Sequence, residues 1–125
     1  MDVPKQVEYW RNGSNEDFEV AGELLEKGRF RHALFLAHLA LEKMLKAHVT
    51  RATSDIPPRI HNLVNLAERT GLGFTAEAMS LLRGFNAYQL EGRYPDEAQI
   101  VISRETAKKD MTFAKEMLGW LKAQL

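Results

Sequence analysis

The sequence predicts an all-α, up-and-down four-helix bundle with one additional short helix. Apolar residues recur at steps of three and four along most of the chain, which is the period of amphipathic helices. Helix-breaking residues are confined to a few short segments, and only residues 99–102 look strand-like, with no second strand to pair with. At 125 residues, the chain is expected to form one domain, residues 1–125, with its own hydrophobic core.

The first helix is predicted to run from near Pro4 to Lys27. One arc of about 120° at 100° per residue holds seven positions, all apolar except Ser14, namely Val7, Trp10, Ser14, Phe18, Ala21, Leu24 and Leu25. In the alternative, Ser14 caps a separate helix with an acidic first turn. We favour the continuous helix, in which Gly13 and Ser14 are small contact residues.

The second helix, Arg29 to about Ala52, has two apolar stripes. The broad stripe should face the core and comprises Ala33, Leu34, Ala37, Ala40, Leu41, Met44 and Leu45. Phe35, Leu36 and Leu39 lie on nearly the opposite side. A helix that is apolar on both sides is either central to its bundle or lies between the bundle and a partner. We expect the second stripe to form a dimer interface with another copy of the chain.

Three further helices complete the bundle. A short one is expected at residues 61–70, and the next runs from its cap Thr75 to about Leu90, with Ala78, Leu81, Leu82 and Phe85 facing inward. The last begins with Ser103 as its cap. Its apolar face repeats at steps of four and three and consists of Ala107, Met111, Ala114, Leu118, Leu121 and Leu125, widened by Phe113, Met117 and Trp120.

Composition excludes several classes of protein. Lys plus Arg and Asp plus Glu each number 17, and this balance argues against a protein that coats polyanions. The absence of cysteine excludes disulfides, thiolate metal sites and cysteine nucleophiles. The N-terminal residues lack the apolar core of a signal peptide, and the longest apolar stretch, residues 33–41, is too short to span a bilayer. A cytoplasmic protein is therefore expected.

The histidines do not form an obvious catalytic or metal site. Arg31 and His38 face the same way but lie two turns, about 10 Å, apart along the helix axis. They are too far apart to converge on one phosphate, so we assign them to a dimer edge or the surface. His48 lies at the core angle and is expected to be a satisfied structural histidine. Because no HxxxH or HExxH pair exists, we predict no metal, no cofactor and no catalytic residue.

Charged residues occur on both long helices. Asp17 falls inside the apolar arc of the first helix, and burying an unpaired carboxylate costs several kcal/mol. We therefore expect a cation or hydrogen-bond donors beside it. Arg93 is the candidate, acting as a loop-to-bundle clamp or, alternatively, within a ligand site. Glu42, Lys43 and Lys46 lie on the outer half of the second helix, where a solvated or interfacial pattern with a Glu42–Lys46 pair is expected.

The segment Arg93-Tyr94-Pro95-Asp96 is polar, and its proline fixes the direction of the chain. In one interpretation Tyr94 plugs the end of the bundle. In the other, a cation and aromatic rings are offered to a nucleotide or RNA by His61, Asn86, Tyr88, Arg93 and Tyr94.

Several short groups of residues, in their order and spacing along the chain, resemble the HEPN domain. The resemblance covers nearly the whole chain and rests on Trp10 with Asp17, on 28–30 (GRF), 37–47 (AHLALEKMLKA), Pro58 with His61 and Leu63, 85–88 (FNAY) and 93–96 (RYPD). It implies a four- or five-helix bundle that often dimerises and often pairs with a minimal nucleotidyltransferase encoded beside it. Some family members cut RNA with an arginine and a histidine four to six residues apart near the start of the fourth long helix.

The corresponding stretch, residues 83–93, contains no histidine, so this chain departs from the ribonuclease motif. The resemblance therefore implies a non-enzymatic accessory subunit, homodimeric and bound to a nucleotidyltransferase, with nucleotide or RNA contact as an addition. The alternative is a metal-independent ribonuclease or toxin of a toxin–antitoxin pair that uses an unorthodox set such as His61, Arg93 and Tyr94. A third hypothesis is a bundle whose only role is assembly.

Overall fold

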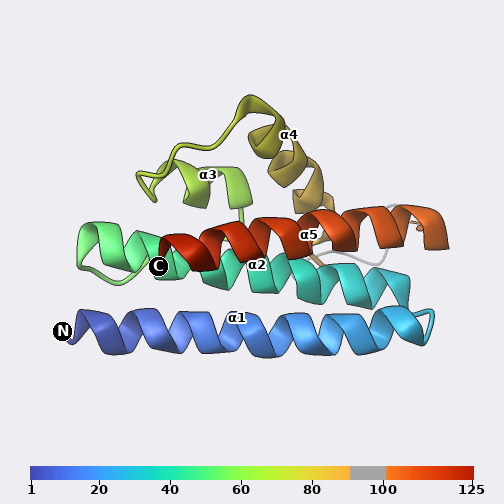
Figure 1. Ribbon diagram of the computed structural model, residues 1–125, viewed down its shortest axis with the longest axis horizontal. Coiled ribbons are helices and arrows are strands. Elements are labelled where there is room, and N and C mark those ends of the chain that lie inside the picture. The colour runs from blue at the N-terminus through green and yellow to red at the C-terminus, as the bar shows by residue number, and fades with distance from the viewer. Residues whose placement is uncertain (91–100) are drawn as a thin grey trace.

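The computed structural model describes residues 1–90 and 101–125 and confirms the all-α prediction (Figure 1). Its elements, in order, are α1 (Val3–Glu26), α2 (Phe30–Thr53), α3 (Leu63–Glu68), α4 (Ala76–Phe85), the 3-10 helix η1 (Asn86–Tyr88) and α5 (Arg104–Gln124). Of the strand-like segment, Gln99 and Ile100 lie outside the described residues, and Val101 and Ile102 have no regular structure.

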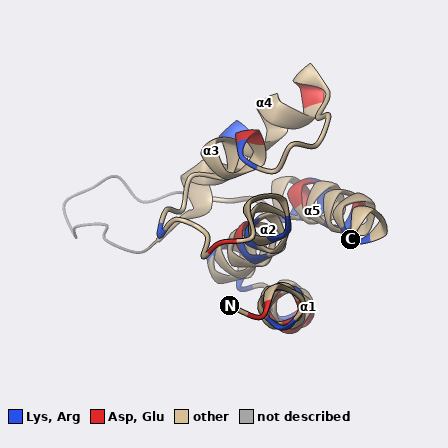
Figure 2. Ribbon diagram, turned by 90° about the vertical axis from the view of Figure 1, so that its left-hand side faces the viewer, with Lys and Arg blue, Asp and Glu red and all other residues tan. Residues whose placement is uncertain are grey.

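Helix α2 is the central element of the fold. It lies between α1 on one side and α5, α3 and α4 on the other (Figure 2). All seven residues of its broad apolar stripe are fully buried. With neighbours on both sides, α2 contributes more buried apolar residues than any other helix, as expected for a helix that is apolar around much of its circumference.

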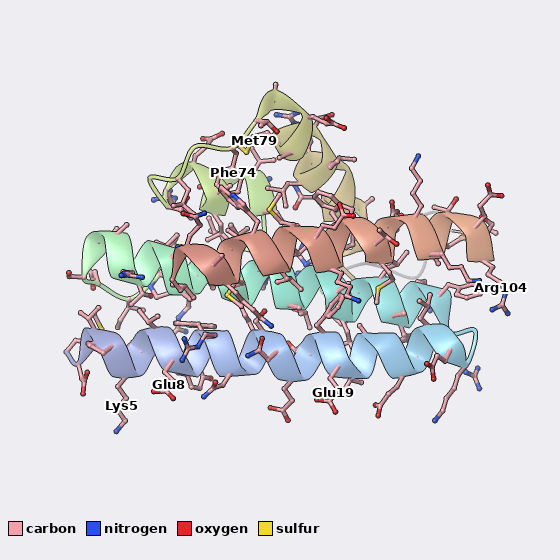
Figure 3. All side chains as sticks on the ribbon, viewed as in Figure 1. Lys5, Glu8, Glu19, Phe74, Met79 and Arg104 are labelled. Atoms are coloured by element: carbon pink, nitrogen blue, oxygen red, sulfur yellow. The ribbon has the colours of Figure 1, made fainter. Side chains whose placement is uncertain are left out.

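Helix α1 is continuous, as predicted, and packs closely on α2. The Ser14 hydroxyl is fully buried and donates a hydrogen bond of 2.6 Å to the backbone carbonyl of Ala40. A Cβ atom at Gly13 would lie only 3.2 Å from Cδ of Lys43. These small residues let the two backbones approach each other. On the opposite face of α1, Lys5, Glu8 and Glu19 point away from α2 (Figure 3).

Helix α5 runs parallel to α2, as the second and last long helices of an up-and-down bundle do. At their starts, the guanidinium of Arg104 lies 5.2 Å from the centre of the Phe30 ring. Near their ends, Nε2 of His48 donates a hydrogen bond of 2.8 Å to the carbonyl of Leu121. His48 is thus the satisfied core histidine that the sequence predicts, and burial lowers its pKa, partly offset by the Leu121 carbonyl.

The predicted caps Thr75 and Ser103 both accept a hydrogen bond from the first turn of their helices. The expected helix lengths were less accurate. Helix α3 covers only residues 63–68 of the predicted 61–70, and α4 stops at Phe85, where the chain tightens into η1 instead of continuing to Leu90.

Two residues expected on inward faces are partly exposed to solvent. Leu81 of α4 is 41% exposed and Trp120 of α5 is 37% exposed. The Trp120 ring instead meets Phe74 edge to face, with ring centres 5.2 Å apart. Helix α4 is short and does not cover the length of α5 (Figure 1). Within residues 1–90 and 101–125, no helix has the length and apolar character needed to cross a bilayer.

Candidate functional site

A largely buried group of ionisable side chains lies on α2 and in the loop before α3. We call Glu42, Lys46, His61 and His38 the Glu42 cluster. The Glu42 carboxylate accepts a hydrogen bond of 2.9 Å from Nζ of Lys46 and one of 3.0 Å from Nδ1 of His61. The side chains of Glu42 and Lys46 are only 6% and 8% exposed. The carboxylate is therefore paired on both oxygens, which is what burial of its charge requires.

The predicted Glu42–Lys46 pair is therefore confirmed, whereas the solvated alternative for this half of α2 was wrong for these two residues. The loop before α3 covers Glu42 through His61. Helix α1 covers Lys46, whose ammonium lies 5.4 Å from the centre of the Trp10 ring. The third residue of this set, Lys43, remains one-third exposed.

His38 is the most deeply buried member of the cluster. Its Nδ1 lies 3.9 Å from Oε1 of Glu42, and its side chain is 0% exposed, so its assignment to a dimer edge or the surface was wrong. Burial lowers the pKa of His38 to about 4, against smaller opposing effects of Glu42 and Asn86. In the described part of the chain, neither ring nitrogen has a hydrogen-bond partner of normal length. His38 is therefore a neutral, buried imidazole at neutral pH.

His61 is the member of the cluster that reaches solvent. Its side chain is 46% exposed, and Nδ1 is directed at the buried Glu42 carboxylate. Because a carboxylate only accepts, Nδ1 carries the proton in this contact, which fixes the ring orientation and directs the chemistry of His61 to Nε2. A histidine oriented by a buried carboxylate is an arrangement suited to proton transfer or to binding a polar ligand.

The structure brings Asn86 close to His61 but places Tyr88 in the core. Oδ1 of Asn86 accepts a hydrogen bond of 2.9 Å from the backbone N–H of Leu63. Tyr88 is buried, meets Phe85 edge to face, and donates a hydrogen bond from its hydroxyl to Asp110. Burial, together with Asp110, raises the pKa of Tyr88. Its ring is not presented for stacking, in contrast to the expectation for this residue.

Three predicted site residues remain, namely Asp17, Arg93 and Tyr94. Arg93 and Tyr94 lie outside the described residues. The structure supplies a different cation for Asp17, since Nζ of Lys43 lies 2.7 Å from its carboxylate. Sequence reasoning missed Glu42, Lys46 and His38 as site residues. All three lie on one side of α2 at spacings of four residues, and this spacing was the signal in the sequence that could have identified them.

The second apolar stripe of α2 is only partly covered. Phe35, Leu36 and Leu39 are each intermediate in exposure within the single chain. Leu36 packs against the edge of the hydrophobic core. The other two side chains lie on the same side of α2 as Lys46.

Comparison with known proteins supports the resemblance to the HEPN domain. The family model of the HEPN domain matches residues 7–124. The structure is similar to TT1696 from Thermus thermophilus, with a TM-score of 0.82, 18% sequence identity, and coverage of 96% of this chain and 98% of that one. It is also similar to ST0689, an archaeal HEPN homologue, with a TM-score of 0.73, 23% identity, and coverage of 94% and 96%. No curated protein gives a significant sequence match.

Proposed function

The chain belongs to the HEPN domain family of helical, nucleotide- and RNA-related domains, and from this premise we propose that it is a non-enzymatic accessory subunit of the cytoplasm. In this proposal it forms a homodimer, pairs with a minimal nucleotidyltransferase, and binds nucleotide or RNA near His61 and Asn86. The observation that supports it most is the partly exposed stripe of Phe35, Leu36 and Leu39 on the central helix. Apolar side chains left open on a helix that is otherwise covered favour a partner surface.

We expect Leu39→Glu to weaken the homodimer by about 100-fold or more, because a two-fold interface would bury the new charge twice. Light scattering coupled to size exclusion measures the molecular mass across a range of concentrations. Val20→Glu is the matched control, since Val20 is an exposed apolar residue on α1, outside the stripe. A parent chain that is monomeric at all concentrations, or a Leu39→Glu variant with unchanged mass, would contradict this interface. The same mass measurement with a small nucleotidyltransferase added, where a neighbouring reading frame encodes one, tests the second partner.

A second function, metal-independent cleavage of RNA, is favoured by one observation, the contact between His61 and the buried Glu42 carboxylate. A histidine held in this way is oriented to act as a general base on a ribose hydroxyl. Arg93 and Tyr94 remain the proposed partners of His61 in this function.

This second function predicts that the chain cleaves RNA in the presence of a chelator and that His61→Asn lowers the rate about 100-fold or more. The measurement is cleavage of several labelled RNAs of different sequence and structure. His32→Asn is the control, because His32 is exposed on α2 and contributes to no polar contact of the cluster. Intact RNA in every case with the parent chain would rule the activity out and leave the accessory role.

A further inference from the structure

A polar pocket lies beside the Glu42 cluster, in the angle between α3 and α4. It has a volume of about 360 Å³. Amide, charged and apolar side chains line it, namely Asn62, Val64, Asn65, Glu68, Arg83 and Asn86. Asn86 also lies next to His38 and so connects the pocket to the cluster.

The fold uses the carbonyl oxygens of all three asparagines. Oδ1 of Asn62 caps α3 by accepting a bond of 3.0 Å from the N–H of Asn65. Oδ1 of Asn65 accepts a bond of 2.7 Å from Nε of Arg69, and Oδ1 of Asn86 accepts one of 2.9 Å from the N–H of Leu63. The amide groups of Asn62 and Asn65 therefore offer mainly N–H donors to a ligand.

Two opposite charges complete the lining. Arg83 on α4 and Glu68 on α3 are both exposed, and neither forms an ion pair with another group in the described part of the chain. The guanidinium donates only, in a planar fork, and the carboxylate accepts only. Val64 adds a half-buried apolar surface. A matching ligand is flat and has acceptors along one edge and donors along another.

We propose that this pocket binds a nucleobase and selects guanine. The N7 and O6 atoms of guanine are two adjacent acceptors, which an arginine fork contacts bidentately. Its N1–H and exocyclic amino group are two adjacent donors, which match the two oxygens of a carboxylate. Arg83 and Glu68 supply these two partners, and the amides of Asn62 and Asn65 supply further donors. This inference rests on the nucleotide or RNA binding proposed above and specifies its base.

The other bases match the pocket less well. Adenine carries an amino donor at position 6, where Arg83 needs an acceptor. Cytosine likewise carries an amino group where Arg83 needs an acceptor. Uracil has two carbonyl acceptors but only one N–H between them, so it can donate only one hydrogen bond to Glu68.

Titration calorimetry with GMP, AMP, UMP and CMP tests the proposal on the full chain. GMP should bind at least about tenfold more tightly than each of the others, since a bidentate pair discriminates by about 1–3 kcal/mol. Arg83→Gln and Glu68→Gln should each lower the affinity for GMP about tenfold and reduce its advantage over AMP. Arg59→Gln and Glu116→Gln are matched controls on exposed residues outside the pocket, and should leave affinity within twofold.

Three outcomes would overturn this inference. Equal binding of the four nucleotides would exclude base selection while leaving nucleotide binding by the domain in place. A preference for GMP that survives both substitutions would place the base elsewhere. Absence of binding by all four nucleotides would exclude the pocket, whereas the homodimer and its partner are judged independently by the mass measurements at Leu39.

Discussion

Glu42→Gln is expected to lower the free energy of unfolding by about 3 kcal/mol or more. The substitution keeps the size of the side chain but removes the negative charge that faces Lys46 and His61. Lys46 is buried against Trp10 and cannot recover a full hydration shell without disturbing the contact between α1 and α2. Removing one member of a buried ion pair leaves an uncompensated charge, and that cost exceeds the net value of the pair itself. Chemical denaturation followed by circular dichroism measures the change.

A double substitution separates the cost of the unpaired ammonium from the loss of the ion pair itself. Adding Lys46→Met to Glu42→Gln removes the unpaired ammonium and should restore much of the lost stability, since an apolar side chain of similar length is tolerated there. Glu116→Gln on the exposed side of α5 is the matched control and should change stability by less than about 0.5 kcal/mol. A loss below about 1 kcal/mol for Glu42→Gln would show that the cluster is hydrated in solution.

Stability should also fall steeply as the pH drops from about 6.5 to 4, because of His38. Its pKa is lowered to about 4 in the folded chain, chiefly by burial, against an ordinary value of about 6.5 in the unfolded chain. Between these two values the unfolded state binds the extra proton, so unfolding is favoured. The contribution of His38 is complete above pH 6.5 and is lost below pH 4. The loss from this one residue amounts to about 3 kcal/mol.

Comparison of the parent chain with His38→Leu isolates this effect. Unfolding free energies measured at several pH values from about 4 to 7 should show a shallower slope in the variant, because it has no buried imidazole to protonate. His48 is retained in both proteins, and its lowered pKa contributes in the same direction to both slopes. Identical slopes for the two proteins would mean that the pKa of His38 is the same in the folded and unfolded states and would contradict this prediction.

A substitution at Glu42 affects stability and function together. Glu42 supports the fold and orients His61 at the same time, so a loss of binding or cleavage after substitution at Glu42 would not distinguish the two roles. His61 is nearly half exposed and is the better residue for testing function. Arg83 and Glu68 have the same advantage in the neighbouring pocket, because both lie on the surface.

Local sequence features determined the secondary structure and the core. Thr75 and Ser103 cap their helices because each hydroxyl reaches a free N–H in the first turn, a relation that involves only a few residues of chain. The broad stripe of α2 is buried because it is the wider of the two apolar faces of this helix. The resemblance to the HEPN domain was likewise visible in the sequence, and the match over residues 7–124 confirms it.

The tertiary structure alone decided which polar residues form a site. A helical angle gives the direction of a side chain but not the segment that will cover it, and for Glu42, Lys46 and His38 that cover comes from α1, the loop at His61 and η1. Tyr88 turned inward for a similar reason, since α4 ends at Phe85 and the tight turn of η1 directs its hydroxyl to Asp110. Such contacts join residues far apart in the sequence, and their geometry depends on how whole helices pack, which no local spacing specifies.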